Sequence, residues 1–225
     1  MKANETGPGR PPEDRRQVKA RRTREALAEA AVELVLERGL GNVTVEAIAE
    51  RADVTRRTFS RYFTGKEDAA LDFTRADGAR INAALRARPE GEPPLLAYRG
   101  AVADWLADRE GPGGQHRPAT RELYAVLDKE PALFAAYERI RVDAQDESVR
   151  IIADRLGTDP SRDLRPGVVV GAAAGVLTAA LRTWARGKDK DAEDLAALVA
   201  RAYDALIKEA GAARAAMASD ITTRE

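Results

Sequence analysis

Arginine and aromatic side chains alternate in the segment VTRRTFSRYFTGKEDAAL, residues 54–71. Arg56, Arg57 and Arg61 fall within six residues, interleaved with Phe59 and next to Tyr62. Guanidinium groups form charge-assisted hydrogen bonds with phosphate and carboxylate oxygens. This pattern therefore indicates a surface for an anionic partner of defined shape. A solvated helix face is the alternative interpretation of the same charges.

Residue types suited to catalysis or metal binding are scarce. The sequence has one histidine, His116, and no cysteine, so it lacks the side chains for a zinc site or a Cys–His nucleophile pair. The stretch GVVVGAAAG at 167–175 lies inside an apolar helical run and therefore does not match a phosphate-binding or dinucleotide-binding loop. We expect no metal, no cofactor and no enzymatic activity.

The charge of the chain is balanced overall but unevenly distributed. The 225 residues contain 37 basic and 37 acidic side chains, so contact with nucleic acid would depend on charge segregation. Segment 15–24 has six basic residues and no acid, and segment 51–66 has five basic residues and one acid. The absence of cysteine fits a reducing compartment. The longest apolar run, 168–181, is too short to span a membrane, and the polar N-terminus lacks the apolar core of a signal peptide. We expect a cytoplasmic protein.

A set of short helices is predicted to position the basic and aromatic residues. Apolar residues recur at three- and four-residue steps from Ala20 to Val35, and Gly39 and Gly41 end that helix. Thr44 is suited to cap a second, short helix. The first 14 residues lack periodicity and are expected to form a disordered arm.

The third predicted helix carries the arginines. A turn at Asp53–Val54 precedes it, Thr55 can cap it, and it should run to about Phe63. Gly65 then breaks the chain before a fourth helix that begins near Lys66. Two short helices joined by a tight turn are typical of a helix-turn-helix, whose second helix enters the DNA major groove.

The apolar residues of this third helix indicate which side is buried. Phe59 and Phe63 are four residues apart and would pack against Ile48 and Leu27. The neighbouring polar and basic residues then face outward, where they can contact bases and phosphates.

The segment TVEAIAERADVTRRTFSRYFTGKEDAAL resembles the DNA-binding signature of TetR-family transcriptional regulators, and the resemblance covers about residues 18–71. The departures are Asp53 in place of glycine, Arg57 in place of glycine or proline, and Ser60 in place of a phosphate-binding tyrosine, for which Arg61 could substitute. The resemblance implies that Thr44, Tyr62 and Lys66 contact phosphate, and that Arg56, Arg57 and Thr58 face bases or backbone. Together with the local pattern, it gives these expected DNA-binding residues: Thr44, Thr55, Arg56, Arg57, Thr58, Ser60, Arg61, Tyr62 and Lys66.

The rest of the chain is also predicted to be helical. Helices are expected at about 95–108, 118–128 and 131–156, after Pro166, and at about 191–210, with no convincing strand. The fold class is therefore all-α. We expect an arm at 1–14, a three-helix DNA-binding domain at 15–66, a helical effector-binding and dimerisation domain at 67–210, and a flexible tail at 211–225.

A strip of small residues marks the helix after Pro166. Gly167, Gly171 and Gly175 recur at steps of four, although each mid-helix glycine costs about 1 kcal/mol relative to alanine. Close approach of another helix would compensate for this cost. The family resemblance implies that the helices at about 166–186 and 191–210 form a homodimer interface. Packing within one protomer, or room for a ligand, are the alternatives. The apolar stripe that we expect on the second of these helices comprises Leu195, Leu198, Val199, Ala202 and Leu206.

Aromatic residues in the C-terminal part are candidates for an effector pocket, although aromatic residues at helical spacing more often form core. Arg141 shares a helix face with two of them and could meet an anionic or carbonyl-bearing ligand, or form a salt bridge at the rim. The candidates are Tyr98, Trp105, Tyr124, Phe134, Tyr137, Arg141 and Trp184.

These observations predict a dimeric, ligand-released repressor that binds a palindromic operator in double-stranded DNA. The small-molecule effector is not specified by the sequence. A DNA-binding regulator that is controlled by a protein partner is the first alternative, and an all-α enzyme or adaptor in which the head is structural is the second.

Overall fold

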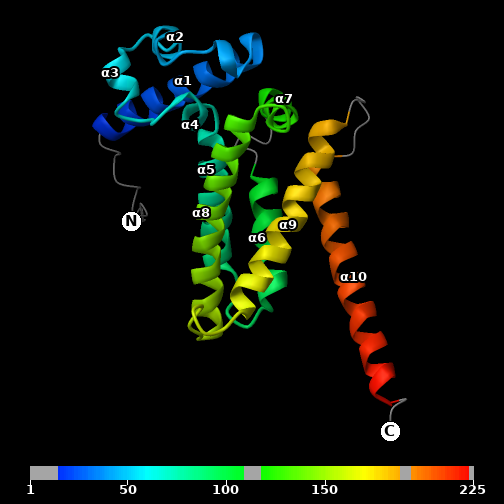
Figure 1. The fold of residues 1–225 in the computed structure, drawn as a ribbon. Coiled ribbons are helices and arrows are strands. Elements are labelled where there is room, and N and C mark those ends of the chain that lie inside the picture. Colours follow the sequence, from blue (N-terminus) through cyan, green and yellow to red (C-terminus); the bar gives the residue numbers. More distant parts are fainter. Residues whose placement is uncertain (1–14, 109–117, 188–193, 223–225) are drawn as a thin grey trace, which may run out of the picture. The chain divides into compact units, whose positions relative to one another are not determined.

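The computed structural model describes residues 15–108, 118–187 and 194–222. These residues form helices and turns and contain no strand, which confirms the predicted all-α class. The chain divides into two compact units, residues 1–70 and 71–225 (Figure 1). The boundary predicted after residue 66 precedes the observed one. The predicted arm at 1–14 lies outside the described residues.

The first unit, which we call the head, has four α-helices and one 3-10 turn in its described part, residues 15–70. Its helix α1 spans Arg15–Arg38, η1 Leu40–Asn42, α2 Val45–Arg51, α3 Arg56–Phe59 and α4 Lys66–Ala70. Leu27, Ile48, Phe59 and Phe63 are each at most 4% exposed, as the periodicity predicts. The rings of Phe59 and Phe63 lie 5.7 Å apart. These side chains fix the orientation of α3 on α1 and α2.

Helix α3 is shorter than predicted. Its regular part ends at Phe59, and residues 60–62 continue as turns rather than as helix to Phe63. The helix predicted to start near Lys66 is likewise interrupted at Leu71, which separates α4 from α5. Apolar spacing correctly predicts helix in both regions. It does not indicate the break at Leu71, because this fully buried leucine fits the apolar pattern of the helix.

The second unit, which we call the helical domain, contains the remaining helices. Helix α5 spans Asp72–Ala87, α6 Pro94–Ala107, α7 Pro118–Leu127, α8 Pro131–Leu156, α9 Arg165–Arg186 and α10 Leu195–Thr222. Prolines occupy the first turn of α6, α8 and α9, where a missing N–H is tolerated. The tail predicted to be flexible from residue 211 is instead a continuation of α10 to Thr222.

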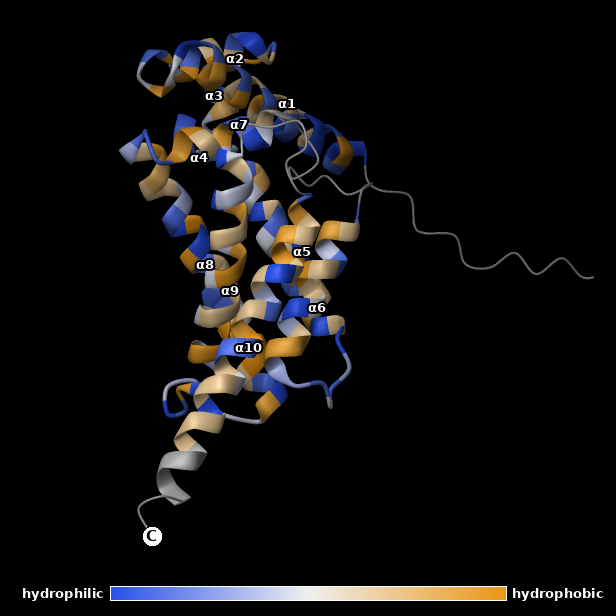
Figure 2. Ribbon diagram, turned by 90° about the vertical axis from the view of Figure 1, so that its right-hand side faces the viewer, coloured by the Kyte–Doolittle hydropathy of each residue, from blue (hydrophilic) through white to orange (hydrophobic). Residues whose placement is uncertain are grey.

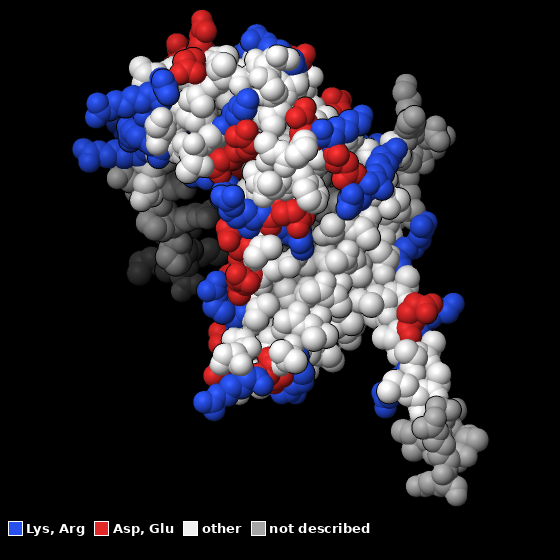
Figure 3. Space-filling view, in the orientation of Figure 1, with Lys and Arg blue, Asp and Glu red and all other residues white. Residues whose placement is uncertain are grey.

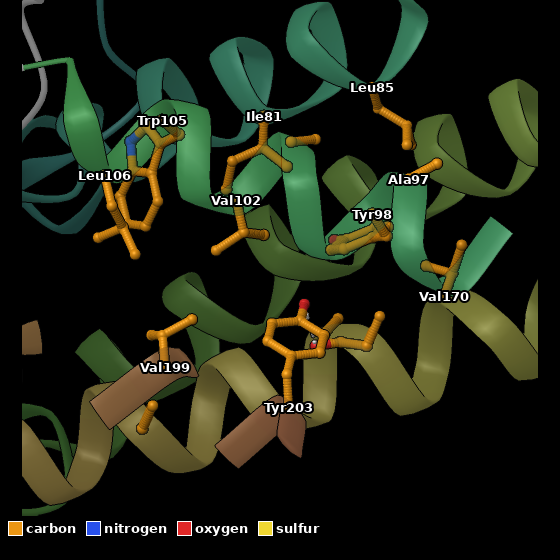
Figure 4. Close-up of a cluster of buried hydrophobic side chains, with 14 of the residues drawn as sticks. Ile81, Leu85, Ala97, Tyr98, Val102, Trp105, Leu106, Val170, Val199 and Tyr203 are labelled. Carbon is orange, nitrogen blue, oxygen red and sulfur yellow. Dashed lines mark hydrogen bonds between the residues drawn. The ribbon is translucent and has the colours of Figure 1, made fainter. Parts of the chain in front are cut away.

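The core of the helical domain joins α5, α6, α8, α9 and the first half of α10. Figure 4 shows Val199 and Tyr203 of α10 pointing toward the α6 side chains, among them Tyr98 and Val102. Tyr203 is fully buried, and its hydroxyl donates a hydrogen bond of 3.0 Å to the Ala173 carbonyl of α9. This contact ties α10 to α9 within one protomer.

Helix α9 is unusually apolar. Among the described residues it is the single helix whose length and mean hydropathy of 1.5 would allow a membrane crossing, although such criteria are also met by core helices of other proteins. It packs against α6, α7, α8 and α10. The apolar run noted at 168–181 is therefore part of a longer packed helix.

Candidate nucleic-acid interface and internal cavity

Threonine caps begin both helices of the helix-turn-helix. The Thr44 hydroxyl oxygen accepts a hydrogen bond of 3.1 Å from the Ala47 N–H, and Thr55 accepts one of 3.1 Å from Thr58. The Thr55 and Thr58 hydroxyls also lie 3.0 Å apart. Both caps were predicted, because a hydroxyl at this position satisfies an N–H that the helix leaves unpaired.

The turn between α2 and α3 has a defined hydrogen-bond pattern. The Val54 N–H donates to the Ala49 carbonyl at 2.9 Å, and the Asp53 N–H donates to the Glu50 carbonyl at 3.0 Å. This pair of bonds is a Schellman motif, which requires a left-handed residue after the helix end. Asp53 occupies that place with φ of 52°, at the position where the sequence departs from glycine.

The three arginines of the turn and α3 differ in their partners. The Arg56 guanidinium lies 3.0 Å from the Glu46 carboxylate, but both side chains are mostly exposed. Arg61 lies over the Tyr62 ring at 5.8 Å. Within the described residues Arg57 is exposed and forms no ion pair. In the part of the chain that the structure describes, Arg57 and Arg61 therefore face solvent without a carboxylate partner. Arg57 belongs to α3 and Arg61 to the turn that follows it.

Two other basic residues of segment 51–66 form contacts within the head itself. Arg51 joins α2 to α1 through Glu33 at 3.0 Å and Glu37 at 2.9 Å, and it lowers the pKa of Glu37. The Lys66 ammonium donates to the Leu40 and Val43 carbonyls at 2.7 and 2.9 Å. Lys66, which was expected to contact phosphate, therefore has a structural role in the head.

The remaining predicted residues, Ser60 and Tyr62, follow the last residue of α3. Ser60 is exposed and its hydroxyl donates to the Arg56 carbonyl at 3.2 Å, while Tyr62 is half-buried. All side chains of residues 55–62 except the buried Phe59 are exposed or half-buried, and they form the surface of α3 and its flanking turns, whereas Thr44 begins α2. Figure 3 shows basic side chains projecting from the region of the head that contains α3. Glu46 was not predicted, because the sequence does not indicate that α2 brings it to Arg56.

A cavity lies inside the helical domain. It opens to solvent on one side, and the empty space within its lining is about 590 Å³ when the solvent-filled mouth is counted. Its lining side chains come from α5 to α9. Gly78 of α5 forms part of its wall at a close helix approach, because an added Cβ would lie 2.9 Å from the Cβ of Ala144 on α8. The predicted residues that line the cavity are Tyr98, Trp105, Tyr124, Tyr137 and Arg141.

Two predicted pocket residues do not line the cavity. Phe134 is 40% exposed on α8, and Trp184 packs under the Arg121 guanidinium at 5.4 Å. Helical periodicity does not distinguish these faces, since it does not indicate which neighbour a face meets. Sequence reasoning also missed Asp77 and Gln145, although a carboxylate on the buried stripe of α5 is a signal that could have been found.

Burial raises the pKa values of three tyrosines that line the cavity. It raises the pKa of Tyr98, raises the pKa of Tyr137 to about 12, and raises the pKa of Tyr124 well above its ordinary value. The Tyr124 ring stands edge-on to Phe73 and Tyr137, with ring centres 5.7 and 5.8 Å away. These tyrosines therefore present neutral phenols and ring edges.

One face of α9 is open. A Cβ added to Gly167, Gly171 or Gly175 would meet no atom within 4 Å, and Val168 is 66% exposed. The glycines therefore do not serve packing within the protomer, which removes one of the alternatives considered above. In Figure 2 most of the visible length of α10 is pale or tan rather than blue, as expected of its alanine-rich sequence.

The apolar stripe predicted on α10 is largely internal to the protomer. Leu195 and Val199 are each 4% exposed, and Leu198 and Ala202 pack partly buried against the core of the same protomer. The outward face of α10 carries Ala197, Ala200 and Asp204. The stripe is apolar as predicted, and its residues pack against α6 and α9 of the same protomer. Its part in a dimer stays a prediction.

Comparisons with known proteins bear on both units. Residues 27–70 match the model of bacterial regulatory proteins of the tetR family, and residues 92–211 match the model of the MftR C-terminal domain. The regulator TcmR of Streptomyces glaucescens, described as an HTH-type transcriptional regulator, is 38% identical over 199 residues, which cover 86% of this chain and 87% of TcmR. The chain belongs to the TetR family.

Solved structures share the TetR fold with this chain. A TetR-family regulator from Syntrophomonas wolfei has a TM-score of 0.57 at 15% identity, covering 82% of this chain and 92% of its own. SmeT of Stenotrophomonas maltophilia has a TM-score of 0.53 at 18% identity, with coverages of 84% and 91%. Family membership identifies the protein as a DNA-binding transcriptional regulator and points away from an enzyme. Among the described residues no cluster of three or more metal-ligating side chains is present.

Proposed function

We propose that the protein is a cytoplasmic, homodimeric repressor that binds a palindromic operator and is released by a small molecule. In this mechanism the surface of residues 55–62 contacts the major groove, with Arg57 donating to base edges and Arg61 to phosphate. The capped start of α3 supports this assignment, since recognition helices contact bases through their N-terminal residues.

The dimer is proposed to form through α9 and α10. The open glycine face of α9 supports this assembly, because three exposed glycines in an apolar helix leave room for a partner backbone. Two-fold symmetry would place two copies of α3 on successive major grooves, about 34–36 Å apart. A ligand that favours a different separation would shift the population toward a form with weaker operator affinity.

The cavity of the helical domain, with its aromatic lining residues, is the main support for release by a ligand. A structure of this fold, SmeT, has been solved with triclosan, with a TM-score of 0.54 at 20% identity and coverages of 83% and 90%. SmeT is described as the repressor of a multidrug efflux pump. Both facts support a repressor in which the helical domain holds a small molecule.

The test starts from an operator selected from random duplexes with the purified protein. A selected sequence with two inverted half-sites, bound at a stoichiometry of one dimer, would support the proposal. Compounds that stabilise the protein against heat should then lower its operator affinity. If stabilising compounds leave DNA binding unchanged, ligand release is wrong, and control by a protein partner becomes the better account.

A further inference from the structure

The walls of the cavity carry two opposite charges that are matched within the protein. The Asp77 carboxylate, 6% exposed, accepts hydrogen bonds from the Trp105 indole N–H at 3.0 Å and from Arg80 at 3.2 Å. The Arg141 guanidinium is held by both carboxylate oxygens of Glu138. An ionised ligand would lose its hydration here and would find no charged side chain that is free to pair with it. Burial of such an unpaired charge is unfavourable.

Several uncharged polar groups of the cavity are also engaged by the protein. The Ser148 hydroxyl donates to Asn82 at 2.6 Å, and the Thr178 hydroxyl donates to the Ala174 carbonyl at 2.9 Å. Gln145 differs from these groups. Its side-chain nitrogen is buried and has no hydrogen-bond partner among the described residues. A buried donor without an acceptor is destabilising, so a ligand oxygen at this place would gain affinity.

The apolar part of the cavity combines aromatic and aliphatic side chains. Four of its lining residues are aromatic, Tyr98, Trp105, Tyr124 and Tyr137, and the larger aliphatic ones are Ile81, Ile140, Leu177 and Leu181. Ring edges and faces favour a ligand that is itself a ring system, because offset and edge-to-face contacts stabilise such pairs.

We propose that the cavity takes an uncharged, ring-containing compound with a carbonyl or hydroxyl oxygen that accepts a hydrogen bond from Gln145. This inference rests on the proposed function, in which a small molecule in this cavity controls DNA binding. It names the class of that molecule and the residue that selects for its oxygen.

Three matched probes test the ligand class on the full-length protein. They are 9-fluorenone, which carries the carbonyl; fluorene, which lacks it; and 9-fluorenone-2-carboxylate, which adds a charge. Equilibrium dialysis should give an affinity for fluorenone on the order of fivefold above that for fluorene, as expected for one hydrogen bond. The carboxylate should bind roughly tenfold more weakly than fluorenone, or worse. In a Trp184→Phe background, fluorenone should quench the emission of Trp105.

Two variants assign the hydrogen bond. Gln145→Leu should lower the affinity for fluorenone to that for fluorene and leave fluorene binding unchanged. Phe134→Leu, on the same helix but outside the cavity, should change neither affinity. Failure of fluorenone to bind, a preference for the carboxylate, or equal effects of Gln145→Leu on fluorenone and fluorene would overturn the proposal.

An operator-binding arm separates this inference from the proposed function. Release of the operator by the carboxylate, with no preference for fluorenone, would retain ligand control and overturn the ligand class. Fluorenone binding as predicted, without a decrease in operator affinity, would retain the ligand class and contradict ligand release.

Discussion

At the scale of single residues, Asp53 shows how the turn of the helix-turn-helix is held. The Schellman bonds of Val54 and Asp53 require a left-handed residue, and a side chain in that region costs about 1–3 kcal/mol. Asp tolerates the conformation better than most residues, which explains how the departure from glycine is accommodated.

Asp53→Gly should therefore raise the free energy of unfolding by about 0.5–1 kcal/mol, after allowance for the greater unfolded-state entropy of glycine. Urea denaturation of the two proteins measures the difference. Asp53→Ala is the matched control and should be no more stable than the wild type. A destabilised Asp53→Gly protein would mean that the aspartate side chain holds the turn by a contact of its own.

Tyr137 gives a pH dependence with a definite sign. Burial raises the pKa of Tyr137 to about 12, above an unfolded value of about 10. The neutral phenol is therefore favoured by folding, and its contribution to stability is complete below about pH 10 and disappears as the pH rises toward 12. Tyr137→Phe should flatten the fall in stability over this interval, measured by denaturant titration at several pH values. An equally steep fall in the variant would contradict the assignment.

At the scale of elements, α9 combines a buried face with an open face of glycine. Gly171 is exposed, and a Cβ added there meets no atom of the described residues within 4 Å, so a leucine at this position should leave the fold of the protomer intact. In the proposed dimer, the leucine would separate two closely packed helices at the interface. Gly171→Leu should therefore shift the protein toward monomer, measured by light scattering after size-exclusion chromatography.

The control for this prediction is Ala135→Leu, which adds a leucine side chain at an exposed position of α8. It should leave the association state of the protein unchanged. A Gly171→Leu protein with the mass and dissociation constant of the wild-type dimer would place the interface on another surface.

Local sequence patterns predicted the helices well. Contacts with residues distant in the sequence account for most differences between the predicted and the observed structure. Thr44 and Thr55 act within one helical turn, so their capping role can be derived from the sequence. The role of Lys66 depends on carbonyls more than twenty positions away, and no local pattern indicates them. Leu198 lies on a stripe whose period is correct but whose partner is the protomer's own core. Periodicity predicts that a face is apolar and leaves open what covers it.

At the scale of the whole molecule, a chain with 37 basic and 37 acidic residues can bind DNA only if its charges are separated. The structure reduces the positive surface of the head, because Arg51, Arg56 and Lys66 have partners there. We therefore expect the basic start of α1, from Arg15, to supply a larger share of the phosphate contacts.

Replacement of Arg15 and Arg16 by glutamine should weaken operator binding and make its salt dependence shallower. The slope of log K against log salt should fall by about 0.9 for each phosphate that the variant no longer neutralises. The preference among operator sequences should stay the same. An altered preference would indicate that this segment contacts bases in a groove, and an unchanged affinity and slope would remove it from the interface.

The central claim is that α3 recognises DNA bases, and Arg57→Ala tests it most directly. Fluorescence anisotropy titrations should compare the variant with the wild type on the selected operator and on random duplex at one salt concentration. Arg139→Ala on α8 serves as the control for removal of one positive charge. We predict that Arg57→Ala weakens binding to the operator by about 1–3 kcal/mol, with a relaxed preference at one base pair of each half-site and a much smaller effect on random DNA. Equal decreases in affinity for both duplexes, or no decrease for either, would contradict base recognition by α3.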